Sequence, residues 1–189
     1  MLTCRNINGI VSIDFLMNDD LMKKKGKEAM NQKNLAKYLQ IITIGVAILG
    51  IIICFGVVPV LGKELIGQKG EGYMDWYLPW MILCWVLAVP CYLVLYHFWE
   101  ITKEIKKDNS FSNENAIHLK KISHLFVADI FLLVVGNIVY LALGWNQLGC
   151  FIMCMIIACA GLVLSVLSAA LSHLVYKAAA LKEENDLTI

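Results

Sequence analysis

Four long stretches that carry almost no charge dominate the pattern of hydrophobic and polar positions. They cover residues 39–61, 74–99, 124–145 and 148–175, and the acids inside them are Asp75 and Asp129. Each stretch exceeds the roughly 20 residues that a helix needs to cross about 30 Å of hydrocarbon. Lipid offers no hydrogen-bond partner to free backbone groups, so we predict four transmembrane helices in an all-α, integral membrane four-helix bundle.

The polar segments between these stretches divide the chain into three parts. Residues 1–36 form a basic N-terminal extension that we expect to be disordered, and Met30 is an alternative start of translation to Met1. Residues 37–181 form the four-helix domain, in which residues 100–123 are the loop between the second and third spans. Residues 182–189 form an acidic C-terminal tail.

The loop 100–123 is predicted to contain two short helices that meet at residues 108–110. The first continues the second span, and Ser112 is the expected N-cap of the second, with Glu114 in its first turn. Ala116, Leu119 and Ile122 are then expected to face the bilayer surface or a partner. In the tail, three acids near a helix C-terminus oppose the helix dipole, so we expect the last helix to fray near Glu183.

The distribution of lysine predicts the orientation of the chain. Lysines are frequent before the first span, in the loop 100–123 and in the tail, whereas the segment between the first two spans has only Lys63 and Lys69. The turn 144–149 has none. By the positive-inside rule, both termini and the loop 100–123 are expected in the cytoplasm. Tyrosine and tryptophan residues near both ends of the spans agree with this topology.

Small residues recur along one face of the fourth span at intervals of three and four. They let two helix backbones approach closely, which favours association where lipid removes the hydrophobic gain. We therefore predict a helix-packing stripe, and a ligand path lined by its serines is the alternative. The stripe consists of Cys154, Ala158, Gly161, Ser165, Ser168 and Ser172.

Asp129 is the most unusual residue within a span. An acid at the bilayer centre costs about 2.5–3.5 kcal/mol on insertion scales, so we expect a compensating contact. Asn137 lies nearby on the same span, and the two are candidates for an intramembrane polar contact. The functional alternatives are a proton or cation relay and a signal-sensing contact. The structural alternative is a shallow acid that is hydrogen-bonded to a neighbouring helix or reached by interfacial water.

Composition narrows the function classes. Hydrophobic residues make up 59% of the 189 residues and the formal net charge is +1, so direct nucleic-acid binding is not expected. The seven cysteines and four histidines show no metal-ligand spacing, and we expect neither a metal nor a cofactor. The sequence has no phosphate-binding loop, nucleophile elbow or metalloprotease motif, so an enzyme is not expected.

Two segments resemble those of a known family. Phe111-Ser112-Asn113-Glu114-Asn115 lies in the loop, and Glu184-Asn185-Asp186-Leu187-Thr188-Ile189 ends the chain. Both are similar to segments of the DUF2975 family of uncharacterised four-helix bacterial membrane proteins. The resemblance covers about residues 35–189 and implies a partner in transcriptional control, a small helix-turn-helix regulator. It implies no catalytic residue.

Our leading hypothesis is a non-enzymatic regulatory or accessory protein of the cell membrane. It would meet a cytoplasmic regulator through a partner surface formed by Phe111, Asn115, Leu187 and Ile189. A small transporter or a bacteriocin-immunity-type protein that uses Asp129 is one alternative, and a structural subunit of a membrane complex is another. Besides the lipid bilayer, the sequence leaves a homo-oligomer open as a partner.

Overall fold

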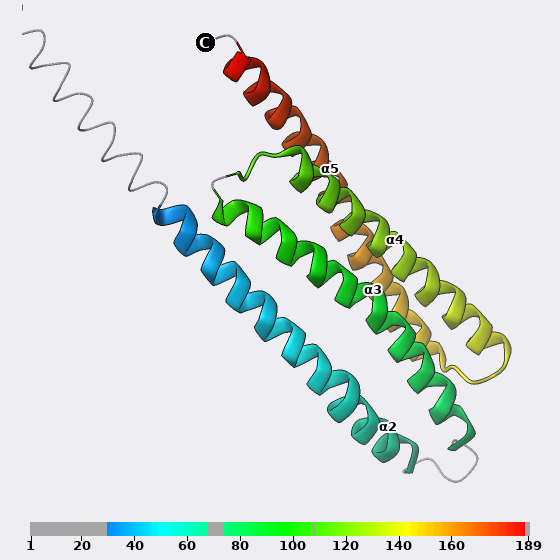
Figure 1. Cartoon of the computed structure of the whole chain (residues 1–189). Helices are drawn as coiled ribbons and strands as arrows, with labels where there is room; N and C mark the ends of the chain where they lie inside the picture. Colours follow the sequence, from blue (N-terminus) through cyan, green and yellow to red (C-terminus); the bar gives the residue numbers. More distant parts are fainter. Residues whose placement is uncertain (1–29, 68–73, 108, 188–189) are drawn as a thin grey trace, which may run out of the picture.

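A computed structural model describes residues 30–67, 74–107 and 109–187. In this part of the chain four helices are long and apolar enough to cross a membrane, and no strand is present. They run side by side along one direction (Figure 1). The predicted all-α fold with four membrane-length helices is therefore confirmed. Of the extension 1–36 that was expected to be disordered, residues 30–36 are helical, which corrects the expectation for that part. Residues 1–29 and the final residues Thr188 and Ile189 lie outside the described residues.

The first helix extends over residues 30–67 and contains a local change of winding. Residues 30–52 are α-helical, the π-helix η1 covers Ile53–Val57, and α2 covers Val58–Gly67. Pro59 has no N–H and cannot bond the carbonyl four residues earlier. Just before it, the Val58 N–H bonds to the Ile53 carbonyl, five residues back, which is the π-helical spacing. The helix thus passes the proline without ending.

Three further helices complete the fold. They are α3 (Met74–Lys106), α4 (Asn113–Ala142) and α5 (Leu148–Leu187). Among the described elements, α4 packs along both α3 and α5 and so lies at the centre of the fold, while α2 and η1 pack on α3. The turn between α4 and α5 uses Gly144 at a φ of 73°, a left-handed conformation that favours glycine.

The two ends of the bundle differ in their number of lysines. The start of the first helix, the connection between α3 and α4 and the end of α5 lie together in Figure 1. We name this the lysine-rich end. The opposite end, which contains the turn 143–147, is the lysine-poor end. The lysines at or near the lysine-rich end are Lys33, Lys37, Lys103, Lys106, Lys107, Lys120, Lys121, Lys177 and Lys182.

The two helices predicted in the loop 100–123 are present, and the first continues the second span as the end of α3. The structure differs in the second, which is not a separate short helix: it is continuous with the third span, so one helix runs from Asn113 to Ala142. Ala116, Leu119 and Ile122 were expected to face the bilayer surface or a partner, but Ala116 and Ile122 are buried and Leu119 is half-buried. For Ala116 the reason is the contact with α5, because the Ser172 hydroxyl bonds to the Ala116 carbonyl.

The end of α5 also differs from the sequence prediction. The predicted fraying near Glu183 is wrong for the backbone, because the helix continues to Leu187. Residues 178–184 are Ala, Leu, Lys and Glu, all strong helix formers, and their propensity outweighs the unfavourable placement of acids near the C-terminus. Residues 182–187 of the predicted tail are thus the last turns of α5.

Candidate functional site

Hydrogen bonds to Glu104 stabilise the end of α3 and the turn that follows it. Its carbonyl accepts hydrogen bonds from the backbone N–H groups of Lys107 and Asn109, both at 3.1 Å. Its carboxylate accepts from Lys107 Nζ at 2.6 Å and from Asn109 Nδ2 at 3.4 Å. The contact with Glu104 raises the pKa of Lys107 above its ordinary value. The connection between α3 and α4 is therefore a defined turn.

The start of α4 is fixed by Ser112 and Asn115. As predicted, Ser112 is the N-cap: its side chain accepts a hydrogen bond from the Asn115 N–H at 3.2 Å. The Asn115 Nδ2 group donates to the carbonyls of Asn109 and Ser110. This side chain is only 1% exposed, so Asn115 does not lie on the surface predicted for it. Its buried amide instead fixes the backbone of the loop through these two hydrogen bonds.

Phe111 is the exposed apolar residue among the described residues of this loop, with 57% of its surface accessible. It lines a shallow hollow of about 310 Å³ between the loop and the end of α5. The hollow therefore joins the loop, which contains the first segment that resembles the family, to the turns of α5 just before the second such segment. The side chain of Leu187 lies outside the described residues. The hollow is lined by Asn109, Phe111, Ser112, Asn113, Ala179, Lys182 and Glu183.

Asp129 lies on the side of α4 that faces α3. The Cys91 thiol donates to Asp129 Oδ2 at 3.6 Å, while Asp129 Oδ1 is buried without a described hydrogen-bond partner. Two further residues on this side also contact α3: Leu83 packs against Gly136, and the Tyr140 hydroxyl donates to the Pro79 carbonyl at 2.8 Å. The acid therefore belongs to the contact between α3 and α4.

Asn137 is fully buried near the lysine-poor end. Its Oδ1 accepts a hydrogen bond from Asn146 Nδ2 at 2.7 Å, and its own Nδ2 donates to the Leu133 carbonyl. Trp80 Nε1 also donates to the Trp145 carbonyl at 3.0 Å, so the turn between α4 and α5 is tied to two helices. Asn137 is eight residues, or about 12 Å of helix rise, from Asp129, and the two form no common polar contact.

The small-residue stripe of α5 lies against α4. Cys154, Ala158, Ser165 and Ser172 are buried, and Gly161 admits the Ile130 side chain. The Ser172 hydroxyl donates to the Ala116 carbonyl at 2.7 Å, and Ser165 bonds to the hydroxyl and carbonyl of Ser123. Ser168 differs because it bonds to the Leu164 carbonyl of its own helix.

The proposed polar path is not assembled by this arrangement. Ser165 and Ser172 contact the α5-facing side of α4, which also presents Ile130, whereas Asp129 contacts α3. Among the described residues, no group of three or more His, Cys, Asp or Glu side chains is close enough together to hold a metal ion. The geometry thus yields structural polar contacts along the bundle and an exposed loop at the lysine-rich end.

Comparison with known proteins agrees with this architecture. Residues 26–189 match the family described as "Protein of unknown function (DUF2975)". The chain belongs to this family. It is also 29% identical, over 110 residues, to the "Uncharacterized membrane protein YoaS" of Bacillus subtilis (strain 168), a match that covers 57% of this chain and 69% of the relative. No solved structure matches the chain.

As a DUF2975 protein with four membrane-length helices, this chain is a membrane protein of a family without an assigned function. Sequence reasoning missed Cys91 as the partner of Asp129 and Asn146 as the partner of Asn137. It also missed the short contact of 3.0 Å between the Nδ1 atoms of His97 and His118. Helical periodicity places residues on a face of one helix, but it does not identify the residue opposite on the next.

Proposed function

We propose that this protein is a non-enzymatic regulatory or accessory protein of the cell membrane whose lysine-rich end lies in the cytoplasm. Both termini and the turn between α3 and α4 are then cytoplasmic. The support for this orientation is the lysine distribution, because loops rich in lysine and arginine are retained on the cytoplasmic side. A soluble partner would reach the protein at this end.

The hollow between the loop and the end of α5 is the observation that supports a partner surface. Phe111 is a large apolar side chain exposed at a lysine-rich helix end, and Lys182 and Glu183 add charges of both signs beside it. Exposed aromatic side chains that insert into a partner's pocket are frequent centres of binding energy. We propose a small helix-turn-helix regulator as the partner, the class that the resemblance to the family implies.

Site-specific photocrosslinking in cells tests this proposal. A photoreactive phenylalanine analogue at position 111 is expected to form a covalent adduct with a small helix-turn-helix regulator of the same cell. The matched control is position 131, because Phe131 is 65% exposed but lies within the apolar part of α4. An adduct at 111 alone supports the proposal, and loss of the adduct after deletion of residues 182–189 assigns the end of α5 to the same surface. Equal adducts at both positions, or none at 111, contradict it.

Transport through the bundle is the second candidate, and Asp129 favours it because Oδ1 is buried without a described partner. A bound cation or proton would supply that partner. If Asp129 acts in transport or immunity, Asp129→Asn abolishes the activity while the protein still accumulates in the membrane. If Asp129 is only a structural contact, the variant behaves as wild type.

A further inference from the structure

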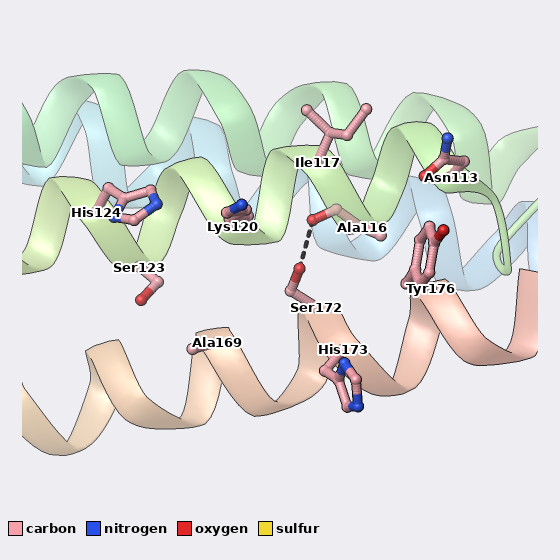
Figure 2. A pocket seen from close by; sticks show the side chains of 10 residues that line it. All are labelled: Asn113, Ala116, Ile117, Lys120, Ser123, His124, Ala169, Ser172, His173 and Tyr176. Atoms are coloured by element: carbon pink, nitrogen blue, oxygen red, sulfur yellow. Dashed lines mark hydrogen bonds between the residues drawn. The ribbon is translucent and has the colours of Figure 1, made fainter.

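A groove of about 450 Å³ lies between α4 and α5 in the half of the bundle nearer the lysine-rich end. This volume is within the roughly 300–1,000 Å³ typical of ligand pockets. Lys120 and His124 border it from α4, while His173 and Tyr176 border it from α5 (Figure 2). Ala116, Ile117 and Ala169 supply apolar walls. The groove is open to the outside of the bundle, since Ile117 is 47% exposed and Tyr176 55% exposed.

The polar groups at the bottom of the groove are already satisfied. Ser172 donates to the Ala116 carbonyl, as the dashed line in Figure 2 shows, and Ser123 bonds to Ser165. Lys120 forms no salt bridge with a described carboxylate, whereas Lys103 and Lys107 each pair with a glutamate. No carboxylate lines the groove in the part of the chain that the structure describes. Its rim therefore offers the Lys120 cation and further hydrogen-bonding side chains to an anion.

We infer that this groove binds the phosphate-containing headgroup of an anionic phospholipid from the adjacent leaflet. Lys120 is the charge partner of the phosphate, and His124, His173 and Tyr176 supply hydrogen bonds. Ala169 lies one turn from His173 toward the lysine-poor end and contacts the start of an acyl chain, whereas Ala116 and Ile117 lie on the outer side of Lys120, beside the headgroup. The inference does not depend on the partner surface at Phe111, and the proposed orientation decides only which leaflet supplies the lipid.

The level of the groove along α4 favours a lipid over a soluble anion. Lys120 and His124 lie one turn apart, and the apolar stretch of α4, in which Asp129 is the one charged residue, begins directly after them at Leu125. The rim thus lies where the headgroups meet the hydrocarbon. Basic pockets between transmembrane helices at this level bind anionic lipid headgroups. A free phosphate would use the same polar groups but leave the apolar walls without a ligand.

Native mass spectrometry of the full chain in mild detergent tests the inference. The protein is incubated with equal amounts of phosphatidylglycerol and phosphatidylcholine with identical acyl chains. We expect preferential retention of phosphatidylglycerol and a fall of about five-fold in its apparent affinity in Lys120→Gln. The control Lys177→Gln removes the same charge from an exposed residue of α5 that does not line the groove, and its effect is expected to be less than about two-fold.

A second variant tests the shape of the groove without changing charge. Ala169→Phe fills the groove and is expected to reduce retention of phosphatidylglycerol as strongly as Lys120→Gln does, with an unchanged midpoint of thermal unfolding. Equal losses in Lys120→Gln and Lys177→Gln would contradict the inference by indicating attraction to net charge alone. Equal retention of the two lipids would also contradict it. Displacement of phosphatidylglycerol by excess inorganic phosphate would identify a soluble anion as the ligand instead.

Discussion

The contact between α4 and α5 and the contact between the first helix and α3 use different chemistry. Between α4 and α5, small residues allow close approach, and short side chains of α5 bond directly to the α4 backbone. Between the first helix and α3, long side chains reach across: the Tyr92 hydroxyl donates to the Ala47 carbonyl, and Phe55 stacks on Trp85. In lipid, close packing and interhelical hydrogen bonds drive association. We therefore expect α4 and α5 to be the firmer pair.

The largest expected effect comes from a bulky residue placed in the firmer contact. Ser165→Leu removes the bonds to Ser123 and inserts a large side chain between α4 and α5. We expect the free energy of unfolding to fall by about 2–4 kcal/mol, measured by denaturant titration in lipid–detergent micelles. The control is Gly45→Leu in the first helix, where no atom lies within 4 Å of an added Cβ, and no loss is expected there. Equal losses would contradict the comparison.

The next effect tests whether the turn between α4 and α5 strengthens their contact. Asn137→Ala leaves the amide of the half-buried Asn146 without its acceptor. An unsatisfied buried donor costs about 1–3 kcal/mol, and this donor is only half-buried, so the same titration should show a loss at the lower end of that range. The double variant Asn137→Ala with Asn146→Ala should lose less than the sum of the single variants. Strict additivity would show that the two amides do not interact.

A single interhelical hydrogen bond should contribute less. Ser172→Ala removes the hydroxyl that donates to the Ala116 carbonyl, which still accepts a backbone hydrogen bond within α4. The expected loss is about 0.6 kcal/mol and at most about 1.7 kcal/mol. Ser168→Ala is the matched control on the same helix, because Ser168 bonds only to its own helix. A larger loss for Ser168→Ala would refute the assignment of the stripe.

The smallest effect is expected in the weaker contact. Tyr92→Phe removes only the hydroxyl that donates to the Ala47 carbonyl. We expect a loss of about 0.6 kcal/mol or less in global stability. Hydrogen exchange should become faster in residues 30–67 while α4 and α5 keep their protection. Faster exchange throughout all helices would indicate that the first helix and α3 form part of the same cooperative unit as α4 and α5.

The four membrane-length helices and the start of α4 are the parts of the fold that could be predicted from the sequence. Uncharged stretches of membrane length identified the four helices, and Ser112 identified the start of α4. Both signals are local, because they depend on residues within one helix or one turn. The lengths of α4 and α5 beyond the apolar stretches were missed, since hydropathy marks where a chain contacts lipid and not where its helix ends.

The candidate site was less predictable because its contacts join different helices. Asn115 was predicted on a partner surface, but its amide is turned inward to the loop carbonyls, which only the tertiary arrangement determines. Asp129 was recognised as unusual, yet its partner Cys91 lies on α3 at a depth that the sequence of α4 does not specify. The groove at Lys120 combines side chains from two helices, so no motif in the sequence indicates it.

The most direct test of the account is the side of the membrane on which the lysine-rich end lies. A reporter fused after Asn109 in the turn between α3 and α4 should be fluorescent as green fluorescent protein and inactive as alkaline phosphatase. Fusions after Gln147, in the turn at the lysine-poor end, should give the opposite pair of results. Active alkaline phosphatase after Asn109 would contradict the orientation and the cytoplasmic partner. Recovery of the intact chain from the soluble fraction without detergent would contradict the four membrane-spanning helices.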